Sequence, residues 1–300
     1  MALKLLAIGE AMAELRQSAM SDYSVGFAGD TFNTAVYCSR ALPPEAKVSF
    51  MTRVGMDPLS QSFLDLANSE GLDTSFISKD QDHNIGIYSV STDGAGERSF
   101  HYWRSNSAAR KIFQIDESVN FLPPADIVYL SGITLAIMHP AARQRLIEYL
   151  QKLSDNGDSL VAFDSNFRPQ LWENRETARQ VIGDMWSLAD IALPSIDDEM
   201  DLFEDKSEEA VLSRFSSHDW TACAVKRGVR GPVSPGIKTD AHPQFEPADK
   251  VVDTTAAGDS FNGGYLAAFI LGKSEIDCLS AGHACASRVV GFRGAITPSA

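Results

Sequence analysis

Short apolar runs alternate along the chain with longer stretches in which apolar residues recur every three or four positions. The short runs, which are typical of buried parallel strands, lie at 3–8, 48–52, 126–130, 160–164, 191–193 and 222–225. The longer stretches predict helices at 32–41, 58–69, 140–153, 176–189 and 208–215. This alternation predicts an α/β fold, a doubly wound, mainly parallel sheet flanked by helices on both faces.

Two segments, 12–27 and 85–104, interrupt this alternation, because each has a strand pattern with no helix between its strands. The second contains a predicted turn at 93–96, followed by an aromatic-rich run. We expect these segments to form a small β-sheet lid. Residues 1–11, 28–84 and 105–300 would then form the α/β core, with ligands beyond the carboxyl ends of its strands.

Composition narrows the range of partners. Forty acidic residues against twenty-six basic ones give a net charge of −14, which disfavours nucleic acid and anionic membranes as partners. The four cysteines have neither CxxC nor zinc-type spacing and are expected to be buried, reduced thiols. The N-terminal apolar run is too short for a signal peptide, and no run approaches the roughly 18 residues of a membrane span. We therefore expect a cytoplasmic protein.

The strongest local signal lies at 251–270, where Val251 and Val252 are predicted to end a strand. A helix is then expected to open at Ala256-Ala257-Gly258, whose small side chains would let backbone N–H groups approach a phosphate closely. Asp259 follows in the first turn, where a carboxylate could take a proton from an attacking hydroxyl. The ordinary alternative is that Asp259 only stabilises the helix N-terminus.

This run resembles the DTxxAGD signature of the PfkB, or ribokinase-like, carbohydrate kinases. The resemblance implies a ribokinase-like fold and an ATP-dependent kinase that uses Mg²⁺, with K⁺ as a further candidate. It makes Ala256, Ala257 and Gly258 the anion hole and Asp259 the catalytic base. A Walker A loop is excluded at 272–274, because the glycine required five residues earlier is Ala267, and no GxGxxG follows the first strand.

Other segments resemble the nucleotide and metal motifs of the same family. Lys226, Gly228 and Gly231 match its KxGxxG segment along the nucleotide, and His283 falls where members pack the adenine. The alternatives are a plain surface turn and a structural histidine. The family's NxxE metal motif is altered, with Ser195 at the Asn position, Asp198 at the Glu position and Glu199 adjacent. Either acid could support Mg²⁺ through water, or the acids could simply open a helix.

The predicted sugar site has one segment near the N-terminus and one in the core. Gly29, Asp30 and Asn33 resemble the family's GGxxxN sugar-binding segment, although Ala28 replaces its first glycine, and Asp30 could equally be a helix cap. The segment 164–172 resembles the DxNxRxxLW segment of the 2-keto-3-deoxygluconate kinases within this family. It contributes Asn166 and Arg168, both assigned to ATP, with Arg168 also assigned to the sugar.

The lid contributes the remaining substrate residues. Tyr102, Trp103 and Arg104 resemble an aromatic-aromatic-Arg segment that these enzymes place on the substrate, and Tyr88 lies on the preceding lid strand. A sugar acid needs cations, and guanidinium groups bind carboxylates bidentately. We therefore expect Arg104 to bind the carboxylate, with a salt bridge or an ATP phosphate contact as the alternative for each arginine.

The predicted reaction is ATP-dependent phosphorylation of 2-keto-3-deoxygluconate at its 6-hydroxyl, and the resemblance also implies a homodimer formed through the lid. A fructokinase or other sugar kinase, and a non-enzymatic sugar-acid sensor, remain as alternatives.

Overall fold

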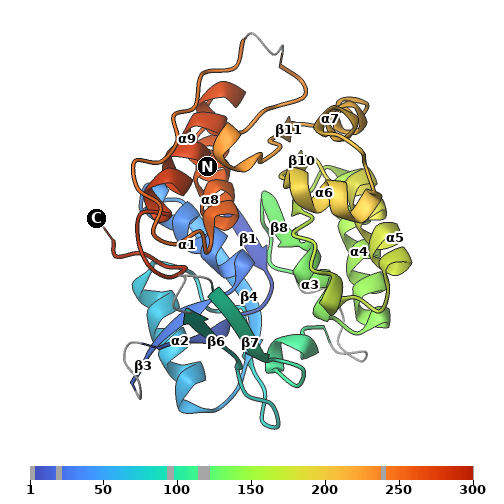
Figure 1. Cartoon of the computed structure of the whole chain (residues 1–300). Helices are drawn as coiled ribbons and strands as arrows, with labels where there is room; N and C mark the ends of the chain where they lie inside the picture. Colours follow the sequence, from blue (N-terminus) through green and yellow to red (C-terminus); the bar gives the residue numbers. More distant parts are fainter. Residues whose placement is uncertain (1–3, 18–21, 93–97, 114–121, 238–240, 300) are drawn as a thin grey trace.

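The computed structural model describes residues 4–17, 22–92, 98–113, 122–237 and 241–299. Its central sheet has seven strands in the order β11-β10-β9-β8-β1-β4-β5, and every neighbouring pair is parallel (Figure 1). The strands are β1 (Lys4–Ile8), β4 (Lys47–Val54), β5 (Ile77–Lys79), β8 (Ile127–Ser131), β9 (Leu160–Asp164), β10 (Ile191–Ala192) and β11 (Ala222–Cys223). The predicted parallel sheet is confirmed.

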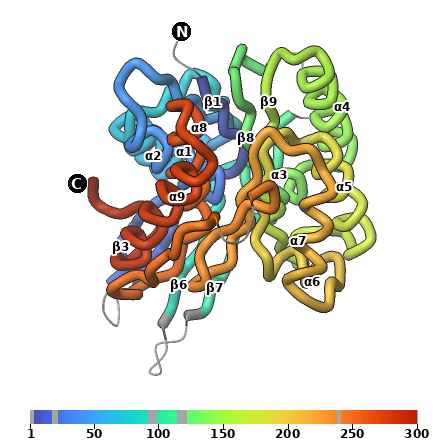
Figure 2. Tube along the Cα trace, turned by 90° about the horizontal axis from the view of Figure 1, so that it is seen from above, coloured from blue at the N-terminus to red at the C-terminus, as the bar shows by residue number. Residues whose placement is uncertain are grey.

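Helices cover both faces of this sheet (Figures 1 and 2). One face carries α1 (Asp30–Ala41), α2 (Pro58–Ser69), α8 (Ala257–Ile270) and α9 (Glu275–Val289). The other carries α3 (Gly132–Ile137), α4 (Pro140–Asn156), α5 (Arg175–Leu188), α6 (Ile196–Phe203) and α7 (Glu208–Ser216). Short 3₁₀ helices lie at Ala108–Lys111, Pro169–Leu171 and Gly228–Arg230.

The apolar strand runs follow from this two-sided burial. Successive strand residues point to opposite faces, so a strand covered on both sides must be apolar at every position. In β1, Leu5 and Ala7 pack with α1 and α8, whereas Leu6 and Ile8 pack with the helices of the opposite face. Each face has its own hydrophobic core, and the sheet separates the two.

A second, smaller sheet holds four strands in the order β3-β2-β6-β7. They are β2 (Met12–Gln17), β3 (Tyr23–Ala28), β6 (Gly86–Thr92) and β7 (Arg98–Trp103), and in Figure 1 this sheet lies at the foot of the central one. The separate sheet expected from the interrupted alternation is thus present. The turn expected at 93–96 lies outside the described residues.

The expected strand end at Val251-Val252 is wrong. Both valines are exposed, by 60% and 38%, and the Val252 N–H donates to the carbonyl of Val290 in the segment after α9. They therefore lack the strand neighbours that would bury an apolar pair. The cysteines match expectation more closely, since all four are free thiols, three of them buried and Cys285 half-buried.

None of the helices in the described ranges is both long and apolar enough to cross a membrane.

Candidate active site

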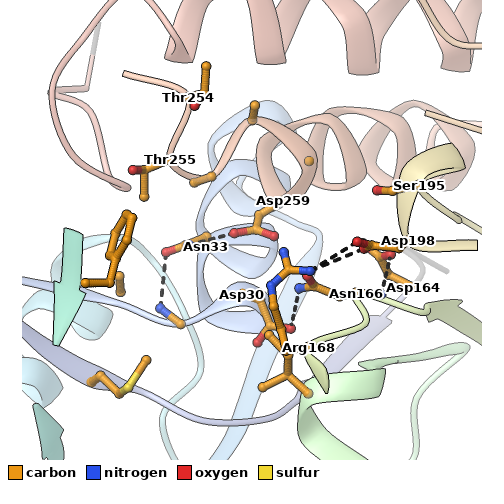
Figure 3. A pocket seen from close by; sticks show the side chains of 18 of the residues that line it. Asp30, Asn33, Asp164, Asn166, Arg168, Ser195, Asp198, Thr254, Thr255 and Asp259 are labelled. Carbon is orange, nitrogen blue, oxygen red and sulfur yellow. Dashed lines mark hydrogen bonds and ion pairs between the residues drawn. The ribbon is translucent and has the colours of Figure 1, made fainter. Parts of the chain in front are cut away.

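The order in which the chain adds strands to the sheet reverses next to β1. The chain passes from β1 to β4 and β5 on one side and later returns to β8, β9, β10 and β11 on the other. At such a switch point the loops after neighbouring strands separate and leave a crevice beyond the carboxyl ends of the strands. A cavity of about 390 Å³ lies there. Asp164, Ser195 and Lys226, which end or follow β9, β10 and β11, line it. Figure 3 shows Asp164 and Ser195.

The second sheet and the first turns of two helices complete this cavity, which we call the main cavity. Met12, Tyr88, Phe100 and Tyr102 form its wall on the side of the small sheet. Gly29, Asp30 and Asn33 come from the start of α1, and residues 254–259 from the loop before α8 and its first turn. The small sheet therefore supplies aromatic surface, whereas the core supplies the polar groups.

A second cavity, of about 360 Å³, adjoins the first. Apolar residues dominate its lining, among them Val229, Phe261 and Val290. The two cavities share Ser195, Asp197, Lys226, Thr254, Ala257 and Gly258 as lining residues. They meet, accordingly, at the N-terminus of α8.

The N-terminus of α8 is suited to binding an anion. Ala256, the N-cap residue, has a left-handed backbone (φ 60°), which is uncommon for a residue with a Cβ and marks a strained turn. Its carbonyl accepts the first intrahelical bond, from the Ser260 N–H at 2.8 Å, and no described side chain caps the helix. The N–H of Ala257 already donates to the Thr254 carbonyl at 3.2 Å, so Gly258 and Asp259 carry the remaining first-turn donors.

Asp259 lines the main cavity and directly follows Gly258, which lines both cavities. The Asn33 side chain donates a hydrogen bond to its carboxylate at 2.8 Å, which ties the start of α1 to the start of α8 (Figure 3). Burial, reinforced by the charge of nearby Asp30, raises the pKa of Asp259 to about 8. A carboxylate with a raised pKa is a competent proton acceptor near neutral pH.

Asp30 and Asn166 lie deeper in the main cavity. The Asn166 side chain donates to Asp30 at 2.9 Å, and burial raises the pKa of Asp30. Asn166 itself has a positive φ of 31°, a second strained position in the lining. Gly29 places these groups, because a Cβ at this residue would lie 2.0 Å from the Glu10 carbonyl oxygen. Only glycine lets α1 begin this close to the chain leaving β1.

Arg168 and Asp198 also line the main cavity and face each other. Their side chains form an ion pair with an N–O distance of 3.2 Å, and the backbone N–H of Phe167 also donates to Asp198 at 3.2 Å. Burial raises the pKa of Asp198, which the Arg168 charge opposes. Within the described ranges, no three His, Cys, Asp or Glu side chains cluster as metal ligands. A single carboxylate ligand such as Asp198 fits Mg²⁺, which keeps several waters and binds mainly through phosphates.

Most of the residues predicted for the nucleotide line the second cavity. Lys226, Gly228 and His283 do so, and the His283 ring contacts the Glu246 carbonyl at 2.8 Å. Gly231 does not: with φ 76° it packs against Phe245, which a Cβ would approach within 2.6 Å. Its role here is to turn the chain.

Three other predicted residues lie outside the lining of both cavities. Trp103 is 61% exposed on the small sheet. Arg104 forms an ion pair with buried Glu10, because the two meet where the chain passes between the sheets. Glu199 is fully buried and bonds Arg214 and Trp186, since α6 turns it towards α7 rather than the site.

Sequence reasoning missed the polar group behind the site. Asp164 bonds both Lys226 and the Asn262 side chain, and Asn262 also donates to the Tyr129 hydroxyl at 3.0 Å. Asn262 is completely buried, one turn after Asp259, and only apolar residues, glycine and one tyrosine follow it in the helix. A polar residue at such a position was the available signal.

The fold and the site together define a sugar kinase of the ribokinase-like class. The chain belongs to the pfkB family of carbohydrate kinases, whose family model matches residues 2–300. It is 39% identical over 305 residues to a 2-dehydro-3-deoxygluconokinase of Escherichia coli strain K12, covering 99% of this chain and 98% of that relative. A protein of the same name from Bacillus subtilis strain 168 is 27% identical, over 88% of this chain and 81% of that relative.

Solved structures agree on the fold. Fructokinase from Vibrio cholerae O395, with fructose, ADP and calcium ion bound, superposes with a TM-score of 0.82 at 22% identity, over 99% of this chain and 95% of that one. Aminoimidazole riboside kinase from Salmonella enterica, complexed with aminoimidazole riboside and an ATP analog, gives a TM-score of 0.81 at 23% identity, over 98% and 95%. These likenesses confirm the predicted ribokinase-like architecture.

Proposed function

We propose that this chain transfers the terminal phosphoryl group of ATP to the 6-hydroxyl of 2-dehydro-3-deoxygluconate, which is the 2-keto-3-deoxygluconate of the sequence analysis. The observation that carries the proposal is the position of Asp259 in the polar main cavity, directly after Gly258, at the uncapped helix N-terminus where this cavity meets the apolar one. The full-length similarity to 2-dehydro-3-deoxygluconokinases supports the choice of acceptor.

The reaction needs a base for the sugar hydroxyl and an anion hole for the phosphoryl group, and the start of α8 provides both. Asp259 accepts the proton of the sugar hydroxyl, whose oxygen forms the new bond to phosphorus as the bond to ADP breaks. The first-turn N–H groups of Gly258 and Asp259 stabilise the phosphoryl oxygens. Ala256 and Ala257 keep side-chain bulk away from them. These residues form the proposed anion hole and base.

The sugar would occupy the main cavity. Gly29, Asp30 and Asn33 would bind its hydroxyls, and Tyr88 and Tyr102 would cover it from the small sheet, which we propose acts as a lid. This support comes from the cavity lining, in which both tyrosines and all three α1 residues take part.

Carboxylate recognition is the finer part of the proposal. The Arg104 guanidinium lies 5.6 Å from the centre of the Tyr102 ring, and that ring lines the cavity. Here Arg104 is paired with Glu10, whose pKa burial raises to about 7. A substrate carboxylate would replace Glu10 as the partner of Arg104, and Glu10 could become protonated at little cost. Arg168 supplies a second cation, shared between sugar and ATP phosphate.

ATP would place its base in the apolar cavity beside His283 and its phosphates towards Lys226 and the start of α8. Asn166 and Arg168 would contact the phosphates from the opposite side. Mg²⁺ would be held by Asp198 through water and would reduce the negative charge on those phosphates. We carry K⁺ as a second candidate cation, to be tested by turnover with and without potassium.

We also propose a homodimer formed through the lid. Tyr23, Val25 and Trp103 are exposed apolar side chains on the face of the small sheet that points away from Tyr88 and Tyr102, and exposed apolar surface often marks an interface. Sedimentation of the chain at several concentrations tests this assembly.

Turnover on a panel of acceptors tests the proposed reaction. The panel holds 2-dehydro-3-deoxygluconate, gluconate, fructose and ribose, with ADP release as the readout and the phosphorylated carbon assigned by ³¹P NMR. We expect kcat/KM for the keto acid to exceed that for each neutral sugar at least tenfold. A preference for fructose would move the assignment to a neutral-sugar kinase, and binding without ADP release would indicate a sensor.

A further inference from the structure

Lys226 occupies a position that its assignment to the nucleotide does not explain. It follows β11, its side chain is 9% exposed, and it lines both cavities. A Cβ built on Gly258 would lie 3.7 Å from its ammonium nitrogen. This buried cation thus lies beside the N-terminus of α8, on the line along which a phosphoryl group would pass from one cavity to the other.

The surroundings of Lys226 fix its ammonium group. The ammonium nitrogen donates to Asp164 and, at 3.1 Å, to the Asn262 side chain. Asn262 in turn donates to the other members of the group, Asp164 at 2.7 Å and the Tyr129 hydroxyl at 3.0 Å. Long lysine side chains lose conformational freedom when held in this way. An ammonium group held in place before ATP arrives needs no rearrangement when charge develops near it.

One donor of this ammonium group remains available. Lysine has three N–H bonds, and the bonds to Asp164 and Asn262 use two of them. Among the described residues, no acceptor takes the third. The charge also reaches the proposed machinery, because Lys226 lowers the pKa of both Asp198 and Asp259.

We propose that Lys226 is a catalytic residue that donates a charged hydrogen bond to the transferring phosphoryl group, with Asp164 and Asn262 as its positioning residues. This inference rests on the proposed phosphoryl transfer. As the sugar oxygen bonds to phosphorus and the bond to ADP breaks, negative charge spreads over the phosphoryl oxygens, opposite the third N–H of Lys226. The helix N–H groups and Lys226 then contact the phosphoryl group from different sides.

The competing explanation is that Lys226 merely neutralises buried Asp164. Removing lysine alone would leave that carboxylate unpaired and could unfold the chain. The decisive variant is therefore the double substitution Lys226→Met with Asp164→Asn, which removes both charges together. Asp164→Asn alone keeps the ammonium but removes its buried counter-charge, and this control is the reference against which the loss that belongs to Lys226 is measured. Melting temperatures of all variants report on folding.

We expect the double variant to fold, to lose at least ~10²-fold in kcat, as for a lost transition-state donor, and to change the KM for either substrate less than about fivefold. The control should lose less than tenfold. Asp164 raises and Lys226 lowers the pKa of Asp259. Removing both charges therefore removes two opposing effects, and the pKa of Asp259 should change little. A pH profile of kcat/KM with an unmoved midpoint will show that the loss is not one of base ionisation.

Chemical rescue distinguishes a donor from a structural cation. In Lys226→Ala with Asp164→Asn, ethylammonium should raise kcat at least fivefold, whereas tetramethylammonium, which has no N–H, should not. A kcat of the double variant within threefold of that of the control, or equal rescue by both cations, would overturn the inference. The proposed function would still stand if the wild type turns over. If the wild type transfers phosphoryl to no acceptor, the proposed function fails and this inference with it.

Discussion

Replacing Asp259 by asparagine should abolish most of the activity and yet stabilise the folded chain. The substitution keeps the shape of the side chain, and the asparagine oxygen can still accept the bond that Asn33 donates at 2.8 Å. What it removes is a carboxylate that burial and the neighbouring Asp30 make costly to ionise. Loss of the base should lower kcat at least ~10²-fold with little change in KM.

The size of the stabilisation follows from the pKa. Raising the pKa of Asp259 from its ordinary value of 3.8 to about 8 means that the folded chain holds a proton which the unfolded chain has lost between those pH values. At about 1.36 kcal/mol per pH unit, full burial would give roughly 5 to 6 kcal/mol above pH 8. The side chain is only partly closed to water, so we expect about 2 to 3 kcal/mol.

The sign of the pH dependence makes the test specific. Below about pH 4 the carboxyl is protonated in both states, so the variant and the wild type should be equally stable. As the pH rises through the interval up to about 8, the wild type should lose stability relative to the variant, and above it the difference should level off. Urea unfolding at pH 4, 6 and 8.5 measures the difference directly.

Asp219→Asn, at an exposed position after α7, is the matched control and should change stability by no more than about 0.5 kcal/mol at any of these pH values. If Asp259→Asn gives a difference that does not grow with pH, or destabilises at pH 8.5, the carboxylate is not the strained group described here.

Three further predictions concern the same site. The kcat/KM for the sugar should rise about tenfold per pH unit below pH 8 and level off above it, since Asp259 must be ionised to accept a proton; a flat profile from pH 6 to 9 would contradict this. Gly29→Ala should destabilise the chain by about 1 to 3 kcal/mol in urea unfolding, whereas Gly183→Ala, in α5 with no atom near its new Cβ, should not. Arg104→Ala should lower kcat/KM for the keto acid at least tenfold and for fructose clearly less, at roughly 1.5–3 kcal/mol per lost charged hydrogen bond, whereas equal losses would make it structural.

Much of the fold was predictable because its elements carry their own boundary signals. The helix Pro58–Ser69 and the strand Leu160–Asp164 match the expected bounds residue for residue. Proline opens the helix and Gly71 follows its end with φ 75°, so local chemistry fixes both limits. A strand buried on both faces can likewise be recognised in the sequence by its continuous apolar run.

Elements without such signals were missed. The helix Gly132–Ile137 follows β8 directly, and all six of its residues are buried, so it has no polar face from which a period could be recognised. The prediction of a strand end at Val251 and Val252 was wrong for the opposite reason. An apolar pair predicts burial, but whether a neighbouring strand is present depends on the packing of the whole domain.

The site divides along the same line. Backbone features, such as the glycine at the start of α1 and the small residues at the start of α8, are local and were predictable from motif and helix chemistry. Partner choices of long charged side chains were not. Arg104 pairs with Glu10 and Arg214 with Glu199, and these residues, distant in sequence, are brought together only by the folded chain.

The acidic character of the chain and its proposed use of an anionic nucleotide are compatible because Lys226 and the start of α8 line the side of the site shared with the second cavity. Asp30, Asp164 and Asp259 surround one end of the main cavity, and each of the first two raises the pKa of Asp259. Lys226 and the α8 N-terminus meet them on the side that faces the second cavity. In the proposed complex Asp30 and Asp259 would face sugar hydroxyls, which are hydrogen-bond donors, while Lys226 and the first-turn N–H groups of α8 would face phosphate. The reacting hydroxyl and phosphorus would meet at the boundary between these two regions, where Asp259 can accept a proton without repelling the phosphoryl group from the side it enters.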